Sequence, residues 1–467
     1  MEYDIVIGLE VHAELKTKSK VFCSCKNQFG STPNSNCCPV CIGLPGALPV
    51  LNKKAVELVI KAGLCMDCEI NDKAVFERKN YFYPDLAKAY QISQLVKPIC
   101  VGGKIELKDK TVRLNRIHLE EDAGKLVHSS RAIGTLIDYN RGGVPLMELV
   151  TEPDISSAEE AVEFLTKLRS ILVYSNVADC KMEEGGMRCD VNLSIKPKGS
   201  DVLGVRSEMK NLNSFKSVYR AIKYEAQRQI DILEQGGKIV QETRKWDDNK
   251  ERSYAMRKKE TSQDYRYFPD PDMLAVNISR ELVSKIKDSL PELADQRFKR
   301  YVSYSLTEYE SEILTRDKAY SDYFDKALSV YFEPKTIANW FLTDVMSKLK
   351  GQDEIKISPE DLALIIKSVD DKVISTKVSK EIFEKAWEEG ASVEKLIKEL
   401  SGNIEGEELR KIVETLVAEN EKAVSDYRTT DQPEKVLRWF MGQVMKMTKG
   451  KANATQAETM ILELIKE

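Results

Sequence analysis

The sequence predicts an α+β fold, with a β-rich first part followed by a helical remainder. Glycine and proline gather in the first part, where 17 of the 23 glycines and 12 of the 15 prolines precede residue 300. Turn-dense β structure uses these two residues, and helix interiors avoid them. All ten cysteines and all three histidines precede residue 190. We therefore expect the chemistry of the protein in its β-rich part.

Size and composition exclude several classes of protein. The chain has 467 residues, of which 42% are hydrophobic and 31% charged, with a net charge of −4. These values predict two to four folded domains and exclude both intrinsic disorder and a histone-like polycation. No apolar run approaches the ~18 residues of a membrane span, and the acidic start resembles neither a secretory signal nor a transit peptide. We expect a cytoplasmic protein with no membrane partner.

The first expected strand spans residues 3–15, where apolar and polar residues alternate. Alternation sends successive side chains to opposite faces of a sheet. Glu10, His12 and Glu14 therefore share one face of this strand, and its apolar residues share the other.

Further strand-like stretches each carry acidic residues. They are 116–122 with Glu120 and Glu121, 145–150 with Glu148, 188–195 with Asp190, and 206–210 with Glu208. The last two stretches are expected to pair as a hairpin, because a turn-rich segment joins them.

Taken singly, each of these acids is explained by a solvated strand face. Together with His12, however, a sheet surface that carries so many carboxylates would repel itself unless a hard cation neutralised it. The pattern therefore predicts a Mg²⁺ site that also binds phosphate.

Two close pairs of cysteines have the spacing of a zinc site. Twelve residues separate the pairs, which are Cys23 with Cys25 and Cys38 with Cys41. Tetrahedral Zn²⁺ takes four thiolates, and a reducing cytosol disfavours disulfides. The alternative is a set of small buried hydrophobic residues. Cys37 is interpreted as a spare thiol, and Cys65 with Cys68 as packing residues.

Neither a P-loop motif nor a Rossmann glycine motif occurs in the sequence, so an ATP site would need another kind of cradle. Residues 78–85 and 264–272 mix cations with aromatic rings, a combination suited to phosphate and base. Each stretch by itself is also typical of a packed loop.

Helical spacing of apolar residues is clear towards the C-terminus. Ser358 and Pro359 form a helix start, and apolar residues recur three and four apart through 382–400 and 437–447 until Gly450. Charge-rich breaks near residue 291 and at 401–406 divide the chain. The expected segments are 1–292, 293–403 and 404–467.

Several motifs, in order along essentially the whole chain, resemble the B subunit of the bacterial aspartyl/glutamyl-tRNA amidotransferase. They are Gly-Leu-Glu-Val-His at 8–12, the two cysteine pairs, and the runs at 78–86, 118–125, 208–215, 264–272 and 450–453. The resemblance implies a heterotrimer with an amidase (the A subunit), which releases ammonia from glutamine, and a small third protein (the C subunit). It implies that ATP and Mg²⁺ activate the side-chain carboxylate of misacylated Glu-tRNA(Gln) or Asp-tRNA(Asn), which ammonia then amidates. No DNA partner is expected.

The resemblance also implies roles for individual residues. The Mg²⁺ pocket would be His12, Glu121 and Glu148; the second metal position Glu10, Asp190 and Glu208; the nucleotide contacts Lys79 and Tyr81; and the Zn²⁺ ligands Cys23, Cys25, Cys38 and Cys41. Glu10, His12, Asp190 and Glu208 would then carry the catalytic step. Strict alternation lets only one of Glu120 and Glu121 face the pocket, and the sequence leaves open which one.

For the fold, the resemblance implies that 1–292 is an open, catalytic cradle with a zinc knuckle, followed by a helical domain, and that 404–467 is a tail that binds tRNA. The tail has a local excess of positive charge typical of contact with a phosphate backbone. The excess lies between residues 428 and 451, where six basic residues stand against the two acids Asp431 and Glu434; they are Arg428, Lys435, Arg438, Lys446, Lys449 and Lys451. The rival interpretations are a stand-alone metal-dependent phosphohydrolase and a non-enzymatic RNA-binding module.

Overall fold

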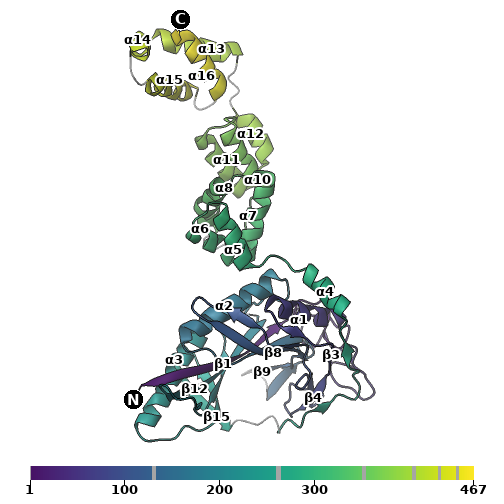
Figure 1. Cartoon of the computed structure of the whole chain (residues 1–467). Helices are drawn as coiled ribbons and strands as arrows, with labels where there is room; N and C mark the ends of the chain where they lie inside the picture. The colour runs from purple at the N-terminus through teal and green to yellow at the C-terminus, as the bar shows by residue number, and fades with distance from the viewer. Residues whose placement is uncertain are drawn as a thin grey trace. The chain divides into compact units, whose positions relative to one another are not determined.

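The computed structural model describes residues 2–128, 133–182, 184–258, 264–349, 354–401, 406–429, 433–448 and 452–466. The chain divides into two compact units, Met1–Ala294 and Asp295–Glu467. Every strand of the described residues lies in the first unit, and the second unit is helical (Figure 1). The predicted α+β class, with a β-rich first part and a helical remainder, is confirmed.

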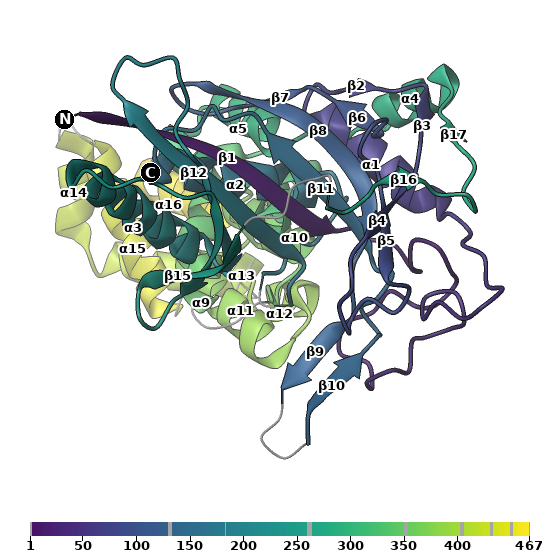
Figure 2. The ribbon, with the colours of Figure 1, turned by 90° about the horizontal axis from the view of Figure 1, so that it is seen from below.

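A ten-stranded sheet forms the centre of the first unit. Its order is β15-β14-β13-β12-β1-β11-β8-β6-β2, and β7 pairs with β8 beside this path. The strands are β1 (Tyr3–Glu14), β2 (Glu69–Ile70), β6 (Cys100–Val101), β7 (Lys104–Glu106), β8 (Thr111–Glu121), β11 (Pro145–Thr151), β12 (Met187–Pro197), β13 (Ser207–Leu212), β14 (Glu242–Asp247) and β15 (Arg252–Lys258). Neighbouring strands are antiparallel except for β13 and β14, which are parallel. Figure 2 shows β1 between β12 and β11.

The two faces of this sheet differ in polarity because the central strands alternate. In β1, Ile7, Leu9, Val11 and Ala13 are fully buried, as the alternation predicts. Their face belongs to the core that three helices cover: α1 (Lys53–Cys65), α2 (Ala158–Tyr174) and α3 (Phe215–Glu234). The opposite face carries the acidic residues.

Smaller strand pairs complete the first unit. They are the hairpin β9 (Lys125–His128) with β10 (Thr135–Asp138), the sheet β16 (Phe268–Pro269), β4 (Glu77–Asn80) and β5 (Tyr90–Ser93), and the pair β17 (Val276–Asn277) with β3 (Lys73–Ala74). The helix α4 (Arg280–Asp288) follows. Figure 2 shows β9 and β10 projecting away from the large sheet.

The second unit consists of helices. They are α5 (Ala294–Ser303), α6 (Glu308–Arg316), α7 (Lys318–Val330), α8 (Pro334–Trp340), the π-helix η1 (Phe341–Val345), α9 (Met346–Lys348), α10 (Pro359–Asp370), α11 (Thr376–Glu389), α12 (Val393–Leu400), α13 (Gly406–Ala418), α14 (Glu421–Thr429), α15 (Pro433–Met447) and α16 (Ala454–Lys466). Among the described residues of both units, no helix is long and apolar enough to cross a membrane.

The expected helix signals are largely confirmed. The hydroxyl of Ser358 accepts a hydrogen bond from the backbone N–H of Asp361, and Pro359 is the first residue of α10. In α15, Phe440 and Val444 are fully buried, but Met447 is half exposed, because it lies at the last turn of the helix. Gly450, the expected stop, lies outside the described residues.

Buried apolar residues of the second unit form two separate clusters. One lies between Tyr301 and Ile397, and the other between Leu409 and Ile465. Each cluster is a core of its own, since a contiguous set of buried contacts defines a core. The division of this region at residue 403 remains a prediction.

Candidate active site

Strand register brings the predicted acids together on the polar face of the large sheet. In the β1–β11 ladder His12 lies opposite Glu148, and in the β11–β8 ladder Glu148 lies opposite His118. One step along the sheet, Glu10 lies opposite Asp190 of β12. Neighbours across antiparallel strands share a face, so two rows of polar side chains run side by side.

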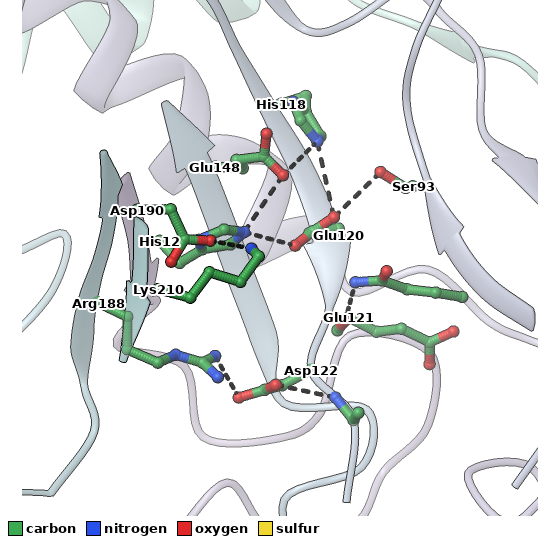
Figure 3. A network of polar contacts seen from close by, with 12 residues as sticks. His12, Ser93, His118, Glu120, Glu121, Asp122, Glu148, Arg188, Asp190 and Lys210 are labelled. Atoms are coloured by element: carbon green, nitrogen blue, oxygen red, sulfur yellow. Dashed lines mark hydrogen bonds and ion pairs between the residues drawn. The ribbon is translucent and has the colours of Figure 1, made fainter. Parts of the chain in front are cut away.

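The first cluster consists of His12, Glu120 and Glu148. The Nε2 atom of His12 is 3.3 Å from Oε1 of Glu120 and 3.2 Å from Oε2 of Glu148. His118 approaches the same two carboxylates, with its Nε2 atom 3.7 Å and 3.5 Å away (Figure 3). The hydroxyl of Ser93 donates a hydrogen bond of 3.1 Å to Glu120. The geometry is therefore two carboxylates held between two imidazole rings.

In this first cluster, the charge of each residue affects the pKa values of its neighbours. Burial lowers the pKa of His12, but hydrogen bonds to Glu120 and Glu148 outweigh it and raise that pKa to about 10. Burial would raise the pKa of Glu148, yet the positive charges of His118 and His12 bring it to about 2. The proton on His12 offsets part of the negative charge of Glu120 and Glu148.

Glu121 lies outside this cluster. Its Oε1 atom accepts hydrogen bonds from Nζ of Lys88 and, at 2.9 Å, from the backbone N–H of Ile92. Glu120 and Glu121 are consecutive in β8, so alternation sends them to opposite faces. Of the two alternatives, the structure brings Glu120 to His12 and holds Glu121 away from it, and the identity of the metal ligand remains a prediction.

The second cluster consists of Glu10, Asp190 and Glu208. One oxygen from each lies within 4.8 Å of the others. The side-chain amide of Asn192 donates to Glu10 at 2.8 Å, and the hydroxyl of Thr243 donates to Glu208 at 2.9 Å. These neutral donors orient two of the three carboxylates.

A lysine supplies the positive charge beside this second cluster. Lys210, two residues after Glu208 in β13, hydrogen-bonds through its Nζ atom to Asp190 and lies 3.3 Å from Oε1 of Glu208. Burial disfavours the ammonium, but the charges of Asp190, Glu208 and Glu10 raise the pKa of Lys210. Lys210 is not among the predicted site residues, because its pairing with Asp190 depends on the fold.

Both clusters line one cavity of about 820 Å³. Its other lining includes Lys79 and Tyr81, the predicted nucleotide contacts, together with Tyr265 and Tyr267. The ammonium of Lys79 is 5.0 Å from the centre of the Tyr265 ring. Burial lowers the pKa of Lys79, but the negative charge of Glu120 outweighs this effect and raises it. The cavity thus joins acidic clusters, a buried cation and aromatic rings.

The two aromatic and basic stretches that the sequence singled out meet here. Phe268 of β16 pairs with Arg78 of β4, and Arg78 hydrogen-bonds to Asp270 and Asp272 at 2.8 and 2.7 Å. This pairing joins segments far apart in the chain and sets Lys79 and Tyr265 side by side. Sequence reasoning named both stretches but had no signal that they were neighbours.

Other charged residues of the cavity were not expected. Asp122 accepts a hydrogen bond of 2.6 Å from Arg188, and Arg141 approaches it at 3.4 Å. Arg116 and Arg206 also line the cavity. Single arginines on strands or in the segments that connect them carry no sequence signal, because the same residue is equally suited to a solvated surface.

The donor sets fit the metals that the sequence predicts. Mg²⁺ binds oxygen ligands, commonly one or two carboxylates with several waters. The carboxylates of each cluster can supply these ligands, in the first cluster beside the imidazole of His12. In the first cluster a metal ion would take the place of the His12 proton.

The cysteine quartet also assembles. The sulfur atoms of Cys23, Cys25, Cys38 and Cys41 lie within 4.8 Å of one another. Tetrahedral Zn²⁺ with bonds of about 2.3 Å places its sulfur ligands about 3.8 Å apart, so the set fits a closed structural site. Cys37 is not part of the quartet, and Cys68 hydrogen-bonds to the carbonyl of Gly102 at 3.0 Å, as expected of a packing residue.

Two family models match the chain. Residues 5–284 match the model described as the GatB/GatE catalytic domain, and residues 322–465 match the GatB domain. The B subunit of the aspartyl/glutamyl-tRNA(Asn/Gln) amidotransferase of Caldicellulosiruptor bescii is 50% identical over 468 residues, which cover 97% of each chain. The proteins of the same name from Thermoanaerobacter pseudethanolicus and Persephonella marina are each 48% identical, over 97% and 100% of both chains.

Proposed function

This chain belongs to the family of the B subunit of aspartyl/glutamyl-tRNA(Asn/Gln) amidotransferase, and on that premise we propose that it amidates misacylated tRNA. The substrates are Glu-tRNA(Gln), Asp-tRNA(Asn) or both. ATP phosphorylates the side-chain carboxylate, and ammonia displaces the phosphate. The ammonia comes from the glutaminase (amidase) member of a cytoplasmic heterotrimer, which also contains the small C subunit.

The observation that carries this proposal is the pair of clusters in one cavity. Activation of a carboxylate by ATP brings together several negative groups, which repel one another unless cations lie between them. His12, Glu120 and Glu148 would hold one Mg²⁺, and Glu10, Asp190 and Glu208 a second. When bound, these ions neutralise the charge of the transferring phosphoryl group.

The residues of the chain itself would position the substrates. The ammonium of Lys79 would hold phosphate oxygens, and Tyr81 would flank the nucleotide. His118 would orient the carboxylates of Glu120 and Glu148 from behind, since its Nε2 atom is 3.7 and 3.5 Å from them.

The quartet of cysteines would hold Zn²⁺ with a structural role. Four thiolates complete a tetrahedral shell and leave no position for a reactive water. This ion would fix the loop between Cys23 and Cys41, a fully described segment that contains no helix or strand.

The tail would bind tRNA. Lys435, Arg438 and Lys446 of α15 are exposed, and Phe440 of the same helix packs in the separate core of α13–α16. Cations at the surface of a helix with its own support are suited to contact with a phosphate backbone. Lys449 and Lys451 belong to the same basic run but lie outside the described residues.

Reconstitution with the amidase partner tests the proposal. We expect conversion of a mischarged tRNA to its amide form that requires Mg²⁺, ATP and glutamine together. Each mischarged tRNA is tested separately, which identifies the substrate. Hydrolysis of a phosphate ester by the chain alone, without amide formation, would favour the phosphohydrolase instead.

A further inference from the structure

We propose that Lys210 is an internal counter-ion that occupies the second metal position until a divalent cation displaces it. This inference rests on the proposed function, which assigns Glu10, Asp190 and Glu208 to that metal. It goes further by making the second metal position an exchange site between two cations.

The position of the ammonium is the first argument. The Nζ atom of Lys210 hydrogen-bonds to Oδ2 of Asp190 and lies 3.3 Å from Oε1 of Glu208. Figure 3 shows the side chain extended towards Asp190. It is therefore placed between two of the three carboxylates that would bind the metal.

Space and charge are the second argument. Opposite oxygen ligands of Mg²⁺ are about 4.2 Å apart, because each binds at about 2.1 Å, so oxygens within 4.8 Å of one another can all reach one cation after small side-chain rotations. An ammonium that contacts two of these oxygens takes up the same volume, and it repels a divalent cation at that distance. The two cations therefore exclude each other.

The supports of the carboxylates are the third argument. Asn192 and Thr243 hold Glu10 and Glu208 through neutral donors at 2.8 and 2.9 Å, which a metal does not have to displace. A lysine ammonium on its four-carbon stem can leave by rotation of side-chain bonds, with no change in the sheet. Exchange thus needs only the movement of Lys210.

This arrangement couples the second metal to the phosphate. A metal that binds alone leaves the displaced ammonium without its two carboxylate partners. When a nucleotide is present, its phosphate oxygens accept that ammonium within the same cavity, which Lys210 lines. The second metal should therefore bind weakly to the free protein and more tightly once a nucleotide is bound.

A titration of the full chain with Mn²⁺ tests this exchange. Electron paramagnetic resonance measures the concentration of free Mn²⁺ at each step of the titration. Lys210→Met keeps most of the length of the side chain and removes its charge, so the weaker Mn²⁺ site should tighten by about tenfold or more. Lys210→Arg keeps the charge and should bind like the wild type. Lys196→Met is the matched control, because its Nζ atom bonds to the carbonyl of Ser200 at 2.6 Å, away from the cluster.

The outcomes separate this inference from the proposed function. Equal Mn²⁺ affinity in the wild type and in Lys210→Met, with loss of the site in Asp190→Asn, overturns the exchange and leaves the metal assignment intact. If Asp190→Asn in the Lys210→Met background changes nothing, the cluster is not a metal site and the proposed function loses its second metal.

A second measurement uses the unaltered protein and does not depend on a variant that folds. Trace acetylation of amines, read by mass spectrometry of peptides, should show faster modification of Lys210 in millimolar Mn²⁺ than without metal. Modification of Lys196 should not change. An unchanged rate at Lys210, under conditions in which two Mn²⁺ ions are bound, would overturn the proposal.

Discussion

His12 and Glu148 face each other across the β1–β11 ladder, with the imidazole Nε2 atom 3.2 Å from a carboxylate oxygen. Because the same nitrogen would bind a metal, proton and metal compete for one position. This relationship would make metal binding at the first cluster sensitive to pH.

Binding of Mn²⁺ at neutral pH should release nearly one proton from His12. The pKa of His12 is raised to about 10, so the ring is protonated at pH 7 and must lose that proton to become a ligand. Affinity should rise about tenfold per pH unit from about pH 6 to about pH 8. Calorimetry in buffers of different ionisation enthalpy measures the number of protons released when Mn²⁺ binds. Binding without proton release would contradict the expected exchange.

Glu10→Gln, Asp190→Asn and Glu208→Gln should each lower amide formation by about 100-fold or more. Each change removes one negative ligand of the second cluster without altering its volume. The glutaminase activity of the partner should not change, because that chemistry belongs to another chain. Asp154→Asn, in a pair with Arg113 outside the cavity, is the control. If the three variants keep full activity over a Mg²⁺ titration, the cluster is only a solvated surface and has no catalytic role.

Cys38→Ser or Cys41→Ser should lower zinc content and thermal stability more than the activity of the protein that remains folded. A closed thiolate shell supports the fold and leaves no open position for a reactive water. Cys37→Ser is a matched control, since this neighbour is outside the quartet and should retain zinc. Elemental analysis of protein purified under reducing conditions decides; wild type without zinc would refute the site.

Glu225→Gln should destabilise the first unit by about 3 kcal/mol at pH 7. Glu225 is fully buried, and burial would raise its pKa, but hydrogen bonds from Arg228 and Gln229 outweigh this and lower it. A lowered pKa stabilises the fold above the pKa of the unfolded chain, about 4.3, and this contribution is lost as the pH falls through the folded value.

The difference between wild type and Glu225→Gln should therefore shrink in acid. Amide hydrogen exchange in β13 and β14, measured on the full chain at pH 7 and at pH 4, follows the local stability. A difference that stays constant over this range would show that the charge of Glu225 does not contribute.

Lys435→Gln, Arg438→Gln and Lys446→Gln combined should weaken tRNA binding and flatten its salt dependence. Each phosphate contact that is lost lowers the slope of log affinity against log salt by about one. One control is Lys104→Gln, which changes an exposed lysine of the first unit. The other control is a thermal melt of the triple variant, which checks that the tail remains folded. The measurement is tRNA affinity at several salt concentrations, for the wild type and the triple variant. Equal slopes would indicate that tRNA is recognised by residues 293–403 or by the first unit.

The alternation of β1 could be predicted from the sequence because a period of two is local. It placed Glu10 and His12 on one face, and the structure agrees. The choice between Glu120 and Glu121 could not be made in this way, since both fit a strand and only the tertiary contacts of Lys88 and Ile92 identify the side that Glu121 faces.

Long-range pairing accounts for most of what the sequence did not show. The contact of Lys79 with Tyr265 and that of Lys210 with Asp190 depend on which strands become neighbours. Composition singled out the stretches at 78–85 and 264–272, but it contains no information about the distance between them in the folded protein. Likewise, apolar spacing placed Met447 on the stripe of α15, yet its position at the helix end leaves it half exposed.

The central place of β1 has a consequence for the order in which the site forms during synthesis. β1 is made first, but its neighbours β11 and β12 begin only at Pro145 and Met187. Long loops must close before either ladder forms, which is slow compared with local folding. The first cluster needs β8 and β11 beside β1, so it can assemble only after β11 has left the ribosome, and the second cluster has to wait for β12 and for Glu208 of β13. A nascent chain that stops before β11 has neither cluster, and one that stops before β13 lacks the second, so a complete second cluster reports that the chain has been made as far as β13.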